Sequence, residues 1–266
     1  MALVHLNHYS YYLGMDIPMD ILLPEKRGQK PERLNGKQYP VLYLLHGHSD
    51  DNTCWIRKSL IELLVRDYDV VVVMPNGHRG FYTNGKQGQL YYDYFAEEIP
   101  LVIANYFPVS KRREDTYVAG LSMGGYGALK LALSCPQRFG TAASMSGAMD
   151  AFGATDRADT LTTAPDFHEH VIRMFGDGAD YRGSENDLRK LARDVIDQGL
   201  PMPRIYQSCG RQDPLYEINV RFREFMEQNW RPEYYHYQES DGDHNWDFWN
   251  RELPCILKYM GLIDGR

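Results

Sequence analysis

The segment Gly120-Leu121-Ser122-Met123-Gly124 decides the fold prediction, because a run of β-forming residues leads into it and a helix-forming run follows it. Residues 116–120 predict a short strand, and residues 123–134 predict a helix rich in small side chains. A serine flanked by glycines between two such elements is typical of a nucleophile elbow, a sharp turn that exposes the serine hydroxyl. The alternative is an ordinary glycine-rich helix start in which Ser122 only caps the helix.

Short apolar runs elsewhere extend this strand-to-helix unit into a repeated pattern. Residues 41–45 and 70–74 are continuous apolar runs that end in turn residues, as central strands covered on both faces do. The other predicted strands are 17–23, 141–146, 204–209 and 234–238, and the other predicted helices are 59–67, 92–107, 215–229 and 246–260. Because strands and helices alternate, we predict an α/β fold with a mainly parallel central sheet and helices on both faces.

The bulk composition limits the classes of partner. With 266 residues the chain is long enough to bury a large core, and we expect one domain spanning residues 1–266. The formal net charge is −7, and acidic and basic residues are interspersed. No basic surface for nucleic acid or for a membrane is therefore expected.

The cysteines and the N-terminal residues give weaker indications. Cys54, Cys135, Cys209 and Cys255 are far apart in the sequence, so we expect free thiols rather than a zinc or redox site. Neither an export signal nor a membrane-spanning run is visible, which favours a cytoplasmic location. The 20 tyrosines leave a homo-oligomer open.

Residues 150–202 interrupt the alternating pattern. The stretch is rich in Asp, Gly and Thr and carries helical patches at 167–175 and 185–198. We expect an excursion over the sheet, since long connections in compact domains often carry function. It would form either one wall of a substrate cleft or a simple crossover that packs on the sheet.

An activated serine needs a base within hydrogen-bonding reach. In elbow folds the chain order is Ser, acid, His, so only His236 and His244 of the nine histidines lie late enough. His244 lies in a polar turn between the last predicted strand and the last predicted helix, whereas His236 lies inside that strand. We predict that His244 is the base.

The base in turn needs an acid that orients it. Asp213 follows the strand at 204–209 after a short turn, at the strand end where α/β sheets collect functional loops. Glu217 is the alternative. Asp241 and Asp243 flank His244, but residues so close on a turn rarely reach back to the ring. Asp213 is therefore the predicted acid.

The negatively charged intermediate of acyl transfer requires backbone N–H donors. Met123 supplies one donor at the start of the predicted helix. The second should follow the strand at 41–45, where Gly47 lets the chain turn and presents the amide of His48. The side chains of His46 and His48, with nearby aspartates, suggest a metal site, but no further ligand has a recognisable spacing, so no metal is expected.

Aromatic side chains near these segments are candidates for a substrate pocket. Several surround the glycine-rich loop at 76–88, which follows a predicted strand end. Ordinary packing is the alternative for each of them. The candidates are Trp55, Phe81, Tyr82, Tyr91 and Trp246.

These residues together resemble the esterase family that contains esterase D (S-formylglutathione hydrolase), bacterial tributyrin-type esterases, feruloyl esterases and mycolyltransferases. The resemblance runs nearly end to end and is strongest to the short tributyrin and acetyl esterases. It rests on the segments MDILLP (19–24), LLHG (44–47), GLSMGG (120–125), SCGRQD (208–213) and GDHNWDFW (242–249).

The resemblance implies an α/β-hydrolase fold without a large separate lid domain, an acyl-serine intermediate and no cofactor. It gives Ser122, Asp213 and His244 the roles proposed above, with oxyanion amides at His48 and Met123. We therefore predict a serine carboxylesterase for short-chain acyl or aromatic esters, including carbohydrate-linked ones. The alternatives are an S-formylglutathione thioesterase, an acyltransferase and a non-catalytic hydrolase-like binding protein.

Overall fold

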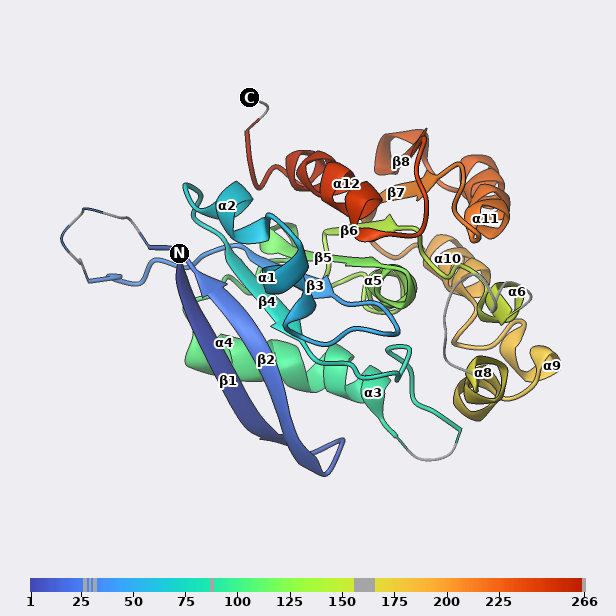
Figure 1. The fold of residues 1–266 in the computed structure, drawn as a ribbon, viewed down its shortest axis with the longest axis horizontal. Helices are drawn as coiled ribbons and strands as arrows, with labels where there is room; N and C mark the ends of the chain where they lie inside the picture. The colour runs from blue at the N-terminus through green and yellow to red at the C-terminus, as the bar shows by residue number, and fades with distance from the viewer. Residues whose placement is uncertain (26–27, 29, 31–32, 87–88, 156–165, 265–266) are drawn as a thin grey trace.

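In the part of the chain that the structure describes, eight strands form one sheet in the order β1-β2-β4-β3-β5-β6-β7-β8 (Figure 1). The computed structural model describes residues 1–25, 28, 30, 33–86, 89–155 and 166–264. The pairs β1–β2 and β2–β4 are antiparallel, and all pairs from β4 to β8 are parallel. This arrangement confirms the predicted mainly parallel sheet. The strands are β1 (Ala2–Ser10), β2 (Met15–Leu23), β3 (Val41–Leu45), β4 (Val71–Pro75), β5 (Thr116–Leu121), β6 (Thr141–Met145), β7 (Arg204–Gly210) and β8 (Tyr235–Ser240).

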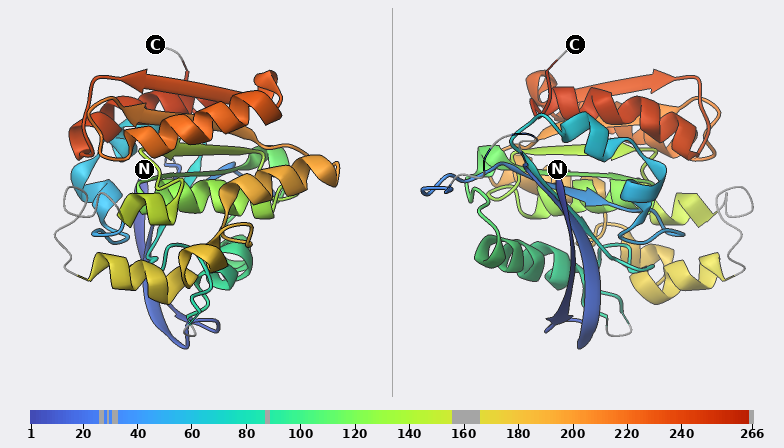
Figure 2. Two further views of the ribbon diagram at one scale, coloured as in Figure 1. Left: turned by 90° about the vertical axis from the view of Figure 1, so that its right-hand side faces the viewer. Right: turned by 60° about the vertical axis from the view of Figure 1, so that its left-hand side comes forward.

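The central strands are apolar throughout because helices cover both faces of the sheet (Figure 2). All five residues of β3 and all five of β4 are buried. One face packs against α4 (Ile99–Tyr106), α5 (Met123–Ser134), α10 (Leu188–Asp197) and α11 (Tyr216–Asn229). The other face packs against α1 (Cys54–Lys58), α2 (Ile61–Val65) and α12 (Trp246–Tyr259). The fold is that of an α/β hydrolase.

The helix predicted at 59–67 is wrong in its extent, because two short helices, α1 and α2, occupy this region. Ser59 lies between them. Its hydroxyl donates to the carbonyl of Trp55 at 2.6 Å and accepts from the amide of Ile61 at 3.2 Å. The serine therefore ends one helix and supports the start of the next.

The helix predicted at 92–107 is interrupted by a π-helical turn. It consists of α3 (Tyr91–Asp93), the π-helical η1 (Tyr94–Glu98) and α4. Two 3₁₀ turns, η2 (Arg113–Asp115) and η3 (Pro232–Tyr234), precede β5 and β8. Strand β1 was not predicted, although its half-buried residues alternate with exposed ones along the whole strand.

The segment 150–202 carries four described helices, which are α6 (Ala151–Thr155), α8 (Phe167–Phe175), α9 (Gly178–Tyr181) and α10. In Figure 1, α6, α8 and α9 lie together beside the sheet. The patch predicted at 167–175 is confirmed in full, and the patch predicted at 185–198 begins three residues later. Residues 156–165 of the predicted excursion lie outside the described residues.

Two further expectations concern the cysteines and membrane spans. All four cysteines are free thiols, as expected. Within the described ranges, none of the helices combines the length and apolar character needed to cross a bilayer.

Candidate active site

Ser122 lies at the turn between β5 and α5, with φ 54° and ψ −121°. This left-handed backbone is strained for a residue with a side chain, and such strain clusters at functional sites. The flanking glycines make the turn possible: a Cβ on Gly120 would overlap the carbonyl of Gly124, and a Cβ on Gly124 would lie 2.5 Å from the carbonyl oxygen of Leu45. The local structure is the predicted elbow.

The side chains of Ser122, His244 and Asp213 form a continuous hydrogen-bonded relay. His244 Nε2 lies 3.0 Å from Ser122 Oγ, and His244 Nδ1 lies 2.9 Å from Asp213 Oδ2. The Asp213 carboxylate is fully buried and also accepts from the amide of Leu215 at 2.8 Å. A carboxylate accepts the Nδ1 proton, which leaves Nε2 free to take the serine proton.

The rival residues do not reach this relay. The Glu217 side chain is largely exposed on α11. His236 lies within β8, where its ring stacks on Tyr206 with centroids 5.0 Å apart. His244 instead packs edge-on against Trp249, with centroids 5.1 Å apart, and is held between that ring and Asp213.

The loop after β3 lies directly against Ser122. A Cβ on Gly47 would lie 2.8 Å from Leu121 Cδ1 and 3.6 Å from Ser122 Cβ, so glycine permits the close approach. The amide of His48 therefore belongs to a segment beside the nucleophile. Met123 is the first residue of the twelve-residue α5, where N–H groups lack intrahelical acceptors and the helix dipole favours an anion.

Both ring nitrogens of His46 are engaged by the main chain. Nε2 accepts from the amide of Gly77 at 2.8 Å, and Nδ1 donates to the carbonyl of Gly47 at 2.7 Å. Burial lowers the pKa of this imidazole, which is consistent with a neutral ring. His46 thus joins the loop after β3 to the loop after β4 and is not available as a metal ligand.

The side chain of His48 is held by an arginine that sequence reasoning missed. His48 Nε2 accepts from Arg79 Nε at 3.0 Å, and the two terminal nitrogens of Arg79 bind the Asp166 carboxylate at 2.8 and 3.2 Å. His170 Nε2 donates to the Arg79 carbonyl at 2.6 Å. Burial, followed by the nearby Arg79 charge, lowers the pKa of His48 to about 3, so the ring is neutral at neutral pH. Arg79 therefore ties the start of α8 to the loop after β3.

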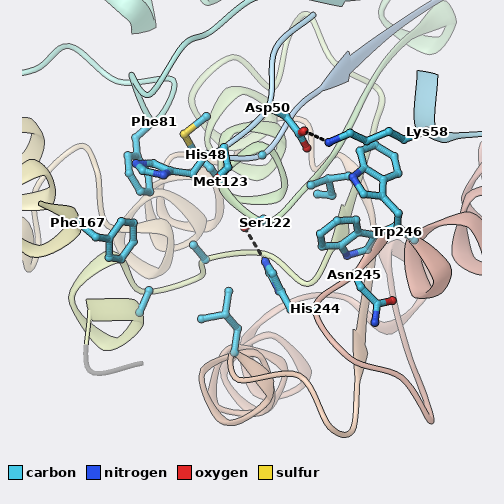
Figure 3. Close-up of a pocket in the computed structure, with 17 residues that line it drawn as sticks. His48, Asp50, Lys58, Phe81, Ser122, Met123, Phe167, His244, Asn245 and Trp246 are labelled. Carbon is cyan, nitrogen blue, oxygen red and sulfur yellow. Dashed lines mark hydrogen bonds and ion pairs between the residues drawn. The ribbon is translucent and has the colours of Figure 1, made fainter. Parts of the chain in front are cut away.

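A pocket of about 310 Å³ opens above Ser122 and His244 (Figure 3). One side is apolar and includes Phe81, Met123 and Phe167, with the His48 ring beside them. The opposite side carries Trp246, Asn245 and the ion pair between Lys58 and Asp50, whose charged atoms lie 2.5 Å apart. The pocket is also lined by Gly47, Ser49, Leu121, Ala148, Ala154, Leu215 and Trp249.

A family model described as "Putative esterase" matches residues 10–260. The chain belongs to this esterase family. An acetyl esterase of Caldicellulosiruptor saccharolyticus is 29% identical over 99% of both chains. Two Staphylococcus aureus structures are each 30% identical over 97% of this chain and 98% of theirs: the fluorophosphonate-binding serine hydrolase FphF, with a TM-score of 0.87, and an S-formylglutathione hydrolase, with a TM-score of 0.84. The protein is a serine esterase, a carboxylic ester hydrolase.

Of the aromatic residues predicted to bind substrate, Phe81 and Trp246 line the pocket of this esterase, and three do not. Tyr82 is fully buried and donates its hydroxyl proton to the His46 carbonyl at 2.7 Å. Tyr91 is buried with its hydroxyl 2.7 Å from His78 Nδ1, and Trp55 packs edge-on behind Trp246 at 5.1 Å. Tyr82 is held by a main-chain hydrogen bond, Tyr91 by a side-chain hydrogen bond and Trp55 by packing, so their predicted contact with substrate is corrected to a supporting role.

The esterase pocket also draws on residues that the sequence pattern did not single out. Phe167 and Ala154 come from the segment 150–202, which therefore contributes to the pocket wall. Lys58 and Asp50 meet from α1 and the loop before it. The only available signal was the helical periodicity of 167–175, because contacts between distant segments leave no local pattern.

Proposed function

We propose that the protein hydrolyses esters of short-chain acids through an acyl-Ser122 intermediate. The observation that carries the proposal is the relay from Ser122 Oγ through His244 to the buried Asp213, which opens into the pocket. The adjacent amides of His48 and Met123 supply the oxyanion donors in this proposal.

The reaction uses each member of the relay twice. Ser122 Oγ bonds to the ester carbonyl carbon while its proton passes to His244 Nε2, and the carbonyl electron pair moves onto oxygen, facing the two amides. Collapse of this intermediate breaks the ester bond, and Nε2–H protonates the departing alcohol. Water then attacks the acyl-serine with His244 again as base, releasing the acid and restoring the serine.

The size of the pocket favours a small acyl group. About 310 Å³ lies at the lower end of the range for small-molecule sites, and it must hold both halves of the ester. The Phe81 and Phe167 rings narrow the apolar side, which suits an acetyl to butyryl chain. The flat faces of these two rings also suit an aromatic acyl group of the feruloyl type. The relative named acetyl esterase supports the shorter acid.

We assign the alcohol half of the ester to the opposite side of the pocket, and we propose that this alcohol is part of a carbohydrate. His244 must protonate the leaving oxygen, and Asn245 and Trp246 follow it directly in the chain. The indole of Trp246 lines this side, with Lys58 Nζ 5.6 Å from its ring centre, and the Lys58–Asp50 pair offers a donor and an acceptor with no net charge. Such a combination matches a neutral polyhydroxyl group.

Hydrolysis of p-nitrophenyl esters from acetate to dodecanoate tests the acyl proposal. We expect kcat/KM to fall steeply beyond butyrate, and Ser122→Ala to abolish turnover on every ester while the far-UV circular dichroism is unchanged. Turnover retained in Ser122→Ala would rule out the mechanism. Methyl ferulate in the same series measures the aromatic alternative.

The alcohol side is tested with an acetylated sugar beside p-nitrophenyl acetate. Lys58→Met keeps the side-chain stem and removes the ammonium, so we expect KM for the acetylated sugar to rise severalfold while p-nitrophenyl acetate is unaffected. An equal effect on both substrates would contradict a role in alcohol recognition.

A thioesterase acting on S-formylglutathione is the second candidate, because a structure so named is 30% identical over nearly the whole chain. Measuring kcat/KM for S-formylglutathione beside kcat/KM for the acetate ester separates the thioesterase from the carboxylesterase. Competition between water and an added alcohol acceptor separates hydrolysis from acyl transfer. Failure of Ser122 to react with a fluorophosphonate probe would favour a non-catalytic binding protein.

A further inference from the structure

Strand β1 is an edge strand without the usual protection. It is the first strand in the sheet order, so only β2 pairs with it among the strands of the described chain. Its nine residues, ALVHLNHYS, include no Asp, Glu, Lys, Arg or Pro. Its register with β2 runs without a bulge from Ala2 to Ser10. Edge strands normally carry charges, prolines or bulges that prevent pairing with another chain.

The opposite edge of the sheet shows what protection looks like in this molecule. Strand β8 has only six residues and carries Glu239 near its end. Glu239 pairs with Arg211 at 3.1 Å and with Arg223 at 3.6 Å. An incoming strand at β8 would have to approach these charged side chains, whereas β1 offers no comparable obstacle.

The side chains of β1 alternate in exposure. Val4 and Leu6 pack on the core, while Leu3 and Tyr9 are 39% and 66% exposed. The hairpin of β1 and β2 also reaches past the neighbouring helices in both views of Figure 2. The edge is therefore both chemically and sterically open to another strand.

We propose that β1 pairs antiparallel with β1 of a second copy of this chain, joining the two sheets across a twofold axis. In the register that aligns all nine residues, Leu3 faces Tyr9 of the second copy and Leu6 faces its own equivalent. His5 faces Asn7 of the second copy. A twofold interface must be self-complementary. On the exposed face of β1 this register sets apolar Leu3 beside Tyr9 and hydrogen-bonding His5 beside Asn7, whereas on the other face Val4 lies beside His8 and Ala2 beside Ser10.

A pair of charge substitutions tests both the interface and its register. Leu3→Glu and Tyr9→Lys each replace an exposed apolar side chain, and each change occurs twice in the dimer. We expect the wild type to sediment as a dimer at micromolar concentrations and each single variant to raise the dissociation constant about tenfold. The double variant should recover dimerisation, because Glu at position 3 then faces Lys at position 9 of the second copy.

The rescue can only be intermolecular, since six residues of extended strand separate positions 3 and 9 by roughly 20 Å within one chain. None of the pocket-lining residues comes from β1, so esterase activity of all three variants serves as the folding control and is independent of the proposed substrate. A monomeric wild type, or dimers unaffected by both single variants, would overturn the proposal. Single variants that dissociate without rescue in the double variant would overturn the register.

Discussion

Asp213→Asn should abolish most of the activity without unfolding the protein, because the surroundings of the carboxylate dictate how the amide must lie. Asp213 Oδ1 accepts from the amide of Leu215 at 2.8 Å, and His244 Nδ1 lies 2.9 Å from Oδ2 and 3.1 Å from Oδ1. In the variant the amide oxygen must stay on Leu215 N–H, since the alternative places two donors together. The new NH₂ group therefore points at Nδ1.

Because the nearer partner of Nδ1 becomes a donor, the variant favours the wrong tautomer of His244. With Nδ1 as acceptor, the ring proton moves to Nε2, 3.0 Å from Ser122 Oγ, where a lone pair is needed. The same exchange in a Ser-His-Asp protease lowers kcat by about 10⁴. We expect a loss of that order in kcat for p-nitrophenyl acetate at pH 7.5, with thermal unfolding within a few degrees of the wild type.

Glu217→Gln is the matched control, because it makes the same chemical change on the exposed surface of α11. Its activity should stay within about twofold of the wild type, because surface substitutions usually change stability by no more than about 0.5 kcal/mol. A decrease in kcat of less than tenfold in Asp213→Asn, or equal decreases in the two variants, would refute the assignment of Asp213 as the acid.

Three further predictions follow from the pocket wall and from two buried basic groups. Phe167→Ala opens the apolar side, so the ratio of kcat/KM for hexanoate to that for acetate should rise at least tenfold, whereas Ile172→Ala on the exposed face of α8 should leave the ratio unchanged. The pKa of His48 is about 3 in the folded protein and about 6.5 in the unfolded chain, so between these values the unfolded state binds more protons. The free energy of unfolding therefore falls as the pH drops from 6.5 to 3. In urea unfolding, His48→Phe should lose less of this free energy over the same pH range than the wild type. Burial lowers the pKa of Lys130 to about 7, so the contribution of this residue to stability improves as the pH rises from 7 towards 10.4. The melting temperature of Lys130→Met minus that of the wild type should therefore be larger at pH 7 than at pH 10. An equal difference at the two pH values would contradict burial as the cause.

The parts of this protein that sequence reasoning predicted are those fixed by short-range geometry. The elbow at Ser122 requires glycine at positions 120 and 124, because a Cβ at either position would meet backbone atoms. Five consecutive residues are therefore enough to predict the turn. His244 and Asp213 each follow a strand of a parallel sheet. Parallel strand ends meet at one edge, so strand order along the chain was enough to bring these residues together as predicted.

Strand β1 escaped prediction because an edge strand is only half buried. Only three small or medium apolar residues, Ala2, Val4 and Leu6, carry the apolar side of its alternation, and His8 continues the same face with a polar ring. Its exposed face mixes Leu3 and Tyr9 with polar residues, so no contrast between the faces marks the period of two. The absence of charge, which is informative in the folded sheet, does not by itself predict a strand.

The substrate pocket was the least predictable part because its walls depend on contacts between distant segments. Arg79 and Asp166 lie 87 residues apart, yet their ion pair holds α8 against the loop that carries His48. Tyr82 is next to Phe81 in the chain, but its hydroxyl turns inward to the carbonyl of His46. Neighbouring aromatic residues on a loop are thus divided between wall and core by tertiary hydrogen bonds. Substrate specificity within this family should accordingly follow changes in these long-range contacts, even where the elbow and the relay are unchanged.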